Sequence, residues 1–214
     1  TAIKQSDIVV VIGGDGTILY TARISSRSAK PILGVNAGRL GFMTDTKAED
    51  LNNALDAVKS GNYTIDKRHF LKAVDNNGNE FFALNEYLFT RKDSTSMINI
   101  TAEYDGSLIN TYWADGLIVS SSTGSTAYNL SSGGPIVVPG SGVMLVTPIN
   151  PHTLTTRPLV VRSDKILKVK VEKQESDVSF SYDGVNCRIE TLPLEVEITT
   201  SDLAFNLIKL PGQN

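Results

Sequence analysis

The chain has 214 residues, of which 41% are hydrophobic and 20% charged, and its formal net charge is -3. This balance excludes a basic surface for nucleic acid or for an anionic membrane, and every apolar run is too short to span a bilayer. The single cysteine, Cys187, excludes an internal disulfide and predicts a soluble protein of the reducing cytoplasm.

Residues 1–66 predict an α/β domain. The apolar strand 7–12 is followed by a helix that begins at about Thr17. The second apolar strand, 31–35, is followed by a helix that Thr46-Lys47-Ala48-Glu49 would open as a capping box. Continuous apolar strands favour a parallel sheet that is covered on both faces. Two strands are too few for a stable sheet, so we expect a missing upstream segment to supply more.

Residues 67–202 instead alternate apolar and polar side chains, which predicts an all-β sandwich. Asp105-Gly106 between two alternating segments is a tight-hairpin signal. In the segment 165–173, Leu167, Val169 and Val171 share one face, and Lys168, Lys170 and Glu172 share the other. The polar segment 120–135 is the exception, because it contains a short predicted helix over 125–132.

An apolar strand ends directly at Gly13-Gly14-Asp15-Gly16-Thr17. Glycines at a strand-to-helix turn permit positive φ and let backbone N–H groups approach an anion, which the helix N-terminus also attracts. A carboxylate is better suited to accepting a proton from a hydroxyl nucleophile than to touching phosphate. The alternative is that Asp15 merely caps the helix. We predict phosphate binding by Gly13, Gly14, Gly16 and Thr17, with Asp15 as the catalytic proton acceptor.

A second glycine-rich turn, 34–42, comes after the second strand. Loops at the carboxyl ends of neighbouring parallel strands face one crevice, which is where open α/β sheets bind ligands. Arg39 is therefore a candidate phosphate ligand. The alternative is that Arg39 is an ordinary solvent-exposed arginine without a ligand.

Three polar stretches mark the β region as a candidate binding site. Asn85-Glu86 interrupts an apolar strand, and adjacent side chains serve one ligand only where the strand ends or bulges. Asp115-Gly116 is a common turn pair and gives weaker evidence. The segment 123–131 is rich in hydroxyls, with Tyr128 as a stacking face and Ser131 as a hydrogen-bonding edge. The alternative is that this segment is a helix N-cap followed by a tyrosine of the core.

Taken together and in this order, five segments resemble the NAD kinase family: GGDGT (13–17), GVNAGRLGF (34–42), LNE (84–86), DGLIVSSSTGSTAYNLSSGGP (115–135) and NPHTL (150–154). The resemblance implies a Rossmann-like α/β domain, completed by a C-terminal return at 203–214, and a β-sandwich that binds the dinucleotide. It implies phosphoryl transfer from ATP to the 2′-hydroxyl of the adenosine ribose of NAD, forming NADP. It further implies a divalent metal, usually magnesium, and a homotetramer.

The resemblance also implies roles for individual residues. Asp15 is the proton acceptor, and Gly16 lies beside the dinucleotide. Ser96 and Trp113 stand where some members use basic or imidazole side chains, so those contacts differ here. The remaining NAD-binding positions are Asn85 and Glu86 on the adenine and ribose side, Asp115 on the nicotinamide side, Asn150 at the pocket wall, and Thr126, Ala127, Tyr128, Asn129, Leu130 and Ser131 around the adenine.

Two other functions fit parts of the pattern. A lipid or other small-alcohol kinase could share the Gly-Gly-Asp-Gly loop, although the polar segment 120–132 argues against an apolar substrate cavity. A non-catalytic sensor of NAD or NADP could share the pocket. The presence of Asp15 disfavours the sensor, because a sensor needs no general base.

Overall fold

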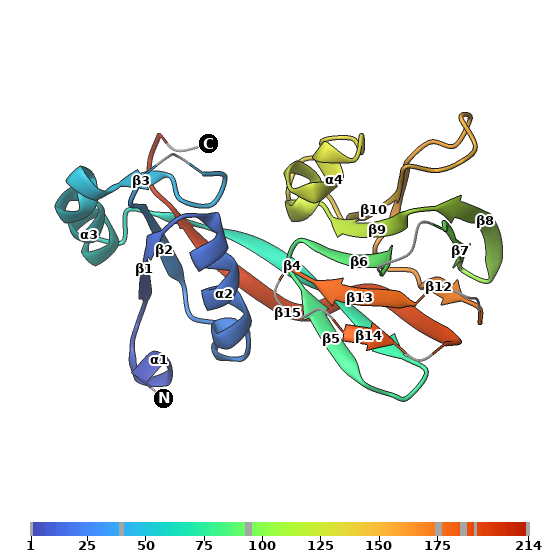
Figure 1. Cartoon of the computed structure of the whole chain (residues 1–214). Helices are drawn as coiled ribbons and strands as arrows, with labels where there is room; N and C mark the ends of the chain where they lie inside the picture. Colours follow the sequence, from blue (N-terminus) through green and yellow to red (C-terminus); the bar gives the residue numbers. More distant parts are fainter. Residues whose placement is uncertain are drawn as a thin grey trace. The chain divides into compact units, whose positions relative to one another are not determined.

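The computed structural model divides the chain into two compact units (Figure 1). Unit 1 comprises Thr1–His69 and Asp202–Asn214, and unit 2 comprises Phe70–Ser201. Two long strands, β4 (Thr64–Asp75) and β15 (Leu194–Lys209), contribute residues to both units. The structure describes residues 2–38, 41–92, 96–173, 177–184, 188–190 and 192–212.

Unit 1 is built on a parallel sheet. The strand β1 (Val9–Gly13) pairs in parallel with β2 (Ile32–Asn36), which also pairs in parallel with β3 (Thr46–Lys47) and with the C-terminal part of β15. Every residue of β2 is buried, as a central parallel strand requires. The predicted α/β sheet is thus confirmed, and β15 supplies a strand that the apolar runs 7–12 and 31–35 did not reveal.

Helices flank this sheet in the chain order β1, α2, β2, β3, α3. The helix α2 (Asp15–Ser25) buries Ile18 and Ala22. Among the described residues, no helix has both the length and the apolar character needed to cross a membrane. The other helical segments are α1 (Ala2–Gln5), η1 (Ser26–Ser28), η2 (Ala48–Asp50) and α3 (Leu51–Lys59).

The predicted capping box at 46–49 is wrong. Thr46 is the first residue of β3, where it is buried and pairs with Val35, and neither η2 nor α3 has a side-chain cap. The α-helix itself begins later, at Leu51. Strand pairing, which depends on distant residues, has overridden a local signal here.

Unit 2 consists of two antiparallel sheets whose inner faces form one core, so the predicted β-sandwich is confirmed. In sheet I, β15 pairs with β12, β12 with β7, and β7 with β8, while β4 pairs with β5. Sheet II has the order β11-β10-β9-β6-β13-β14. The strands not yet bounded are β5 (Glu80–Ala83), β6 (Glu86–Arg91), β7 (Ile98–Tyr104), β8 (Ser107–Ala114), β9 (Gly116–Ser121), β10 (Val143–Ile149), β11 (Leu159–Arg162), β12 (Leu167–Val171), β13 (Val178–Tyr182) and β14 (Arg188–Glu190).

Most of the local structures that the sequence predicts in unit 2 are present. Asp105 and Gly106 join β7 to β8 with φ of 50° and 80°, the left-handed conformation that a tight hairpin turn requires. The strand β12 alternates buried and half-buried residues. The predicted helix over 125–132 is a 3-10 turn, η3 (Thr123–Thr126), followed by the short helix α4 (Tyr128–Ser131).

Aromatic side chains fill the centre of the sandwich. The ring of Phe180 lies 5.0 Å from that of Phe89, 5.3 Å from Phe81 in an edge-to-face arrangement, and 5.9 Å from Tyr87 in a stacked one. The buried Tyr87 hydroxyl donates to the carbonyls of Leu71 and Phe81, both at 2.8 Å. Phe180 therefore joins strands β5 and β6 in one cluster.

We expect Phe180→Ala to lower the free energy of unfolding by about 3–5 kcal/mol, because it removes a buried ring and leaves a cavity among other rings. Denaturant titration followed by circular dichroism measures the change. The control is Leu108→Ala on β8, where the side chain is 66% exposed. An equally small loss in both variants would contradict the assignment of Phe180 to the core.

Candidate functional site

Asp15 connects the two glycine-rich loops of unit 1. It is the first residue of α2 and half-buried, and its Oδ2 accepts the Phe42 N–H at 2.8 Å while its Oδ1 accepts the Met43 N–H at 3.0 Å. The carboxylate thus bonds to the second loop, which is more than its alternative role as a cap of its own helix would need. An ionised carboxylate has about four acceptor positions, so each oxygen can accept a further hydrogen bond.

Gly41 permits this contact. A Cβ atom at Gly41 would lie 2.2 Å from Oδ1 of Asp15, which is closer than any side chain tolerates. By contrast, a Cβ atom at Gly38 in the same loop would meet nothing within 4 Å. In the sequence Gly41 is only one member of a glycine-rich turn, and nothing there signals that its role is to make room for Asp15.

The glycines of the first loop matter because they lack a side chain, and their φ angles are ordinary. Gly13, Gly14 and Gly16 all lack positive φ, so that part of the expectation is wrong. A Cβ at Gly13 would lie 2.4 Å from the Thr17 hydroxyl oxygen, whereas Gly14 and Gly16 face open space. Because Gly14 and Gly16 are exposed at the start of α2, an anion can approach the backbone there.

The two loops meet at the carboxyl edge of the sheet, as the sequence predicts. Gly13 is in register with Asn36, and the Ala37 N–H donates to the Gly13 carbonyl at 3.4 Å. Arg39, the predicted phosphate ligand, lies outside the described residues. A cavity of about 290 Å³ opens beside this edge and is lined by Asn36, Ala37, Gly38, Lys47, Ala48 and Glu49.

In unit 2, Asn85 and Glu86 lie where the chain changes sheets. The segment 80–91 is two strands rather than one, because β5 belongs to sheet I and β6 to sheet II. The carboxylate of the buried Asp183 accepts the N–H groups of Leu84 at 2.9 Å, Asn85 at 2.8 Å and Glu86 at 3.2 Å. Asp183 was not predicted from the sequence, since Tyr-Asp-Gly after an alternating strand has the composition of an ordinary turn.

Glu86 has an unusual electrostatic environment. Its side chain is 9% exposed, and its Oε2 atom has no hydrogen-bond partner among the described residues. Burial raises the pKa of the Glu86 carboxyl from 4.5 to about 7, and the negative charge of Asp183 adds to the rise. A buried carboxyl with a perturbed pKa and a free oxygen is typical of a binding or catalytic position.

The hydroxyl-rich segment packs directly against Asn85. The Asn85 carbonyl accepts the Ser121 N–H at 2.8 Å, and a Cβ at Gly124 would lie 2.3 Å from the same oxygen. Tyr128 is 43% exposed, so it is not the core tyrosine of the alternative interpretation. Leu130 and Ser131 are also exposed, and Thr126 and Ala127 are half-buried.

Asn129 differs from its neighbours because its side chain is fully buried. Its Nδ2 donates to the carbonyls of Ser125 at 3.0 Å and Pro135 at 3.1 Å, and its Oδ1 accepts the Thr147 hydroxyl at 2.7 Å. These bonds hold the loop that carries Tyr128. Any contribution of the Asn129 side chain to ligand binding would therefore act through the shape of that loop.

Asp115 and Asn150 lie together, although 35 residues separate them. The Asn150 amide donates to Asp115 Oδ2 at 3.0 Å, and Asn150 has a left-handed backbone with φ of 44°. The guanidinium of Arg91 pairs with the other oxygen of Asp115 at 2.8 Å. Arg91 was not predicted, because on β6 it has the pattern of an ordinary strand residue.

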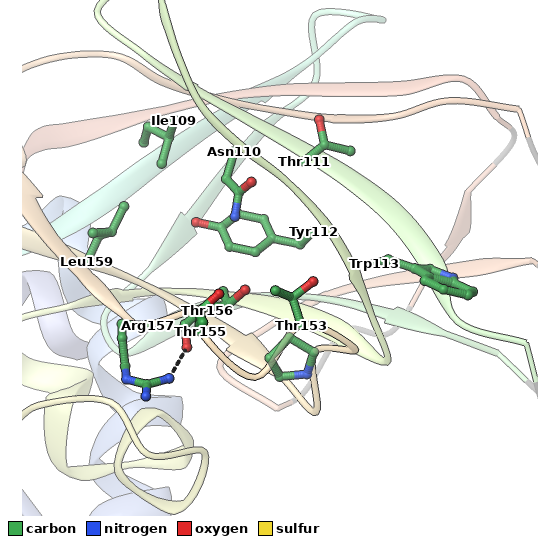
Figure 2. Close-up of a pocket in the computed structure, with 11 residues that line it drawn as sticks. Ile109, Asn110, Thr111, Tyr112, Trp113, Thr153, Thr155, Thr156, Arg157 and Leu159 are labelled. Carbon is green, nitrogen blue, oxygen red and sulfur yellow. Dashed lines mark hydrogen bonds between the residues drawn. The ribbon is translucent and has the colours of Figure 1, made fainter.

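A cavity of about 440 Å³ in unit 2 has none of the predicted NAD-binding residues in its wall (Figure 2). Its arginine, Arg157, donates to the carbonyls of Leu154 and Thr156 at 2.7 and 2.8 Å and so serves its own loop. Trp113, at the wall, packs against His152 with ring centres 4.5 Å apart. The wall consists of Ile109, Asn110, Thr111, Tyr112, Trp113, Pro151, Thr153, Thr155, Thr156, Arg157 and Leu159.

Comparison with known proteins identifies the family of the chain. Residues 1–63 match the ATP-NAD kinase N-terminal domain, and residues 84–210 match the ATP-NAD kinase C-terminal domain. The NAD kinase of Heliobacterium modesticaldum is 42% identical over 97% of this chain and 75% of its own length. The NAD kinase of Cytophaga hutchinsonii is 36% identical over 100% of this chain and 74% of its own length.

Solved structures give the same result. An NAD kinase from Archaeoglobus fulgidus in complex with ATP superposes with a TM-score of 0.81 and 29% identity, over 98% of this chain and 80% of its own. Yeast NADH kinase in complex with NADH superposes with a TM-score of 0.87 and 27% identity, over 98% of this chain and 63% of its own. The fold and these matches define a two-domain kinase. The chain belongs to the NAD kinase family, and the lipid-kinase alternative is therefore wrong.

Because the pKa of Glu86 is raised in the folded chain, the free energy of unfolding should depend on pH. The folded chain keeps the Glu86 proton up to about pH 7, whereas the unfolded chain releases it near pH 4.5. The stabilisation is therefore complete below pH 4.5 and is lost as the pH rises to about 7. At about 1.4 kcal/mol per pKa unit, the loss is at most about 3.5 kcal/mol.

We expect Glu86→Gln to remove this loss, so that the variant gains free energy of unfolding relative to the parent protein as the pH is raised from 4 to 8. Denaturant titrations across this range measure the difference. Glu80→Gln, on the exposed hairpin of β5, is the control for removal of a carboxylate. If the free energy of unfolding changes with pH in the same way in Glu86→Gln and in the parent, Glu86 does not have the raised pKa.

Proposed function

We propose that the chain transfers the γ-phosphoryl group of ATP to the 2′-hydroxyl of the adenosine ribose of NAD, forming NADP and ADP. One observation carries the proposal: Asp15 is oriented by two backbone amides at the carboxyl edge of a parallel sheet, between two glycine-rich loops. Membership of the NAD kinase family supports it, as do a relative solved with ATP and another solved with NADH.

In the proposed reaction Asp15 accepts the proton of the 2′-hydroxyl while that oxygen attacks the γ-phosphorus. The new oxygen–phosphorus bond forms as the bond to the ADP oxygen breaks, so little covalent chemistry is left for the protein. The Phe42 and Met43 amides fix the direction of the carboxylate. Backbone N–H groups of Gly13, Gly14 and Gly16 would donate to the phosphate oxygens at the start of α2, and Thr17, whose N–H donates to the Gly14 carbonyl at 3.0 Å, would offer its hydroxyl.

Magnesium belongs to this proposal as part of the MgATP substrate. Within the described ranges, no group of three or more His, Cys, Asp or Glu side chains has the arrangement of a metal centre. The ion would instead bind the ATP phosphates and neutralise their charge during transfer.

We propose that unit 2 holds the dinucleotide. Glu86 offers its free oxygen to ribose hydroxyls, Asn85 offers its amide to the adenine, and the half-exposed ring of Tyr128 stacks on the base. Such a polar pocket rejects close analogues, because they leave buried groups unpaired. The remaining proposed contacts are Thr126, Ala127, Asn129, Leu130 and Ser131 around the adenine, and Asp115 with Asn150 on the nicotinamide side.

The proposal includes a cytoplasmic homo-oligomer, a tetramer by family resemblance. Unit 2 exposes several large apolar side chains that a second copy could cover, namely Leu108, Ile136, Val138 and Leu154. Sedimentation of the purified chain measures its oligomeric state.

Incubation of the full chain with NAD, ATP and magnesium, followed by an NADP-specific dehydrogenase assay, tests the activity. We expect Asp15→Asn to lower turnover by about two orders of magnitude or more, the scale of losing a general base, with dinucleotide binding largely intact. Calorimetric binding alongside the kinetics separates the two effects. Near-normal turnover in Asp15→Asn would refute the role of Asp15, and binding without any turnover in the parent chain would favour the sensor.

Gly41→Ala tests whether the orientation of Asp15 matters. The added methyl group must displace the Asp15 carboxylate, so we expect turnover to fall by about tenfold to a hundredfold, the sensitivity of catalysis to a misplacement of about 1 Å. Gly38→Ala is the matched control, since its methyl group enters open space in the same loop. Equal turnover in the two variants would show that the position of Asp15 is not limiting.

A further inference from the structure

The backbone between β5 and β6 is held from both sides. Three consecutive N–H groups, those of Leu84, Asn85 and Glu86, leave the strand ladders and converge on the carboxylate of Asp183. On the other side, the Leu84 carbonyl accepts the Ser121 hydroxyl at 2.5 Å, and the Asn85 carbonyl accepts the Ser121 N–H. The peptide groups here are therefore fixed in direction, although Leu84 and Asn85 lie between the strands and only Glu86 belongs to β6.

Asp183 is itself buried and hydrogen-bonded at this position. It lies directly after β13 with φ of 50°, is 5% exposed, and donates its own N–H to the Glu86 carbonyl at 3.1 Å. A carboxylate that accepts several backbone N–H bonds is among the stronger hydrogen-bonding arrangements in proteins, particularly away from water. Its removal would leave buried amides without an acceptor.

We propose that Asp183 is a positioning residue of the dinucleotide site, because its carboxylate turns the chain at Leu84–Glu86 so that the neighbouring side chains of Asn85 and Glu86 can serve one ligand. In a regular strand these two side chains would point to opposite faces of the sheet. This inference rests on the proposed function of Asn85 and Glu86 in binding NAD.

The charge of Asp183 gives the proposal a second consequence. Asp183 is the charged group that acts on Glu86, while the residue opposite Glu86 on β9 is the uncharged Ser120. An ionised Glu86 can accept two ribose hydroxyls, so NAD affinity should rise as the pH passes through about 7. Loss of the Asp183 charge should move this rise to lower pH, because one cause of the raised pKa of Glu86 is removed.

The test compares Asp183→Asn with Asp105→Asn in the full chain. Asparagine keeps the shape and tolerates positive φ, but it replaces one accepting oxygen by an NH₂ group and removes the charge. Asp105 is the matched control, since it has the same φ of 50° and also precedes a glycine, but its side chain is 56% exposed and pairs with Lys165.

We expect Asp183→Asn to weaken NAD binding by about tenfold or more in calorimetry, the scale of losing a charge-assisted hydrogen bond. The KM for NAD should rise more than kcat falls, because Asp15 is untouched. The pH midpoint of NAD affinity should shift down, while Asp105→Asn should match the parent protein in all three measurements. Unchanged NAD affinity would overturn the proposal, and so would weaker binding with an unshifted pH midpoint, which indicates a purely structural role.

Circular dichroism shows whether Asp183→Asn is folded. If it is not, the substitution is repeated in the Glu86→Gln background, which lacks the buried charge, and the double variant should bind NAD more weakly than Glu86→Gln alone. Equal binding by these two would overturn the proposal. A parent chain that makes no NADP would instead refute the proposed function, so the two failures are distinguishable.

Discussion

Backbone N–H groups that leave a helix or a strand ladder must find acceptors, and both candidate sites depend on how this requirement is met. In unit 1 the amides of Phe42 and Met43 donate to Asp15, and in unit 2 three amides donate to Asp183. In each case a carboxylate fixes the backbone of a segment that is distant in sequence. The two carboxylates differ in their proposed roles, because Asp15 is itself the reactive group, whereas Asp183 directs its neighbours.

The different roles proposed for the two units follow from the kind of sheet that each contains. A parallel sheet ends its strands at one edge and places loops and helix N-termini there, which suits phosphate binding. An antiparallel sandwich has no such edge, and the dinucleotide contacts proposed for unit 2 lie where a strand is interrupted. That interruption lies between β5 and β6, where the chain changes sheets and Glu86 keeps a buried oxygen without a partner among the described residues.

The residues proposed to bind the dinucleotide include a buried carboxyl group beside a second carboxylate. Glu86 and Asp183 bring two carboxyl groups close together in a buried environment, which raises the pKa of Glu86 and costs stability near neutral pH. A structural role alone would be served better by an apolar or amide side chain. A carboxyl at this position fits a ligand that offers hydroxyl donors in return.

The amino-acid sequence alone determined the fold class, the turn at Asp105-Gly106, the alternation of β12 and the motifs of the NAD kinase family. These features depend on neighbouring residues, whose periodicity and turn chemistry are local. Asp15 was recognisable as a candidate because a carboxylate among glycines is unusual at the end of an apolar strand. The family resemblance, carried by several motifs in order, supplied the substrates that local patterns could not.

Only the tertiary structure decided which groups meet. It showed that Gly41 makes room for Asp15, that Thr46 joins a strand instead of capping a helix, and that Asp183 holds the peptide groups beside Asn85. Gly41 is 26 positions from Asp15 along the sequence, and Asp183 is 98 positions from Asn85. The physical reason is that hydrogen bonds and excluded volume act between atoms that are close in space, and no local pattern specifies a contact between such distant segments.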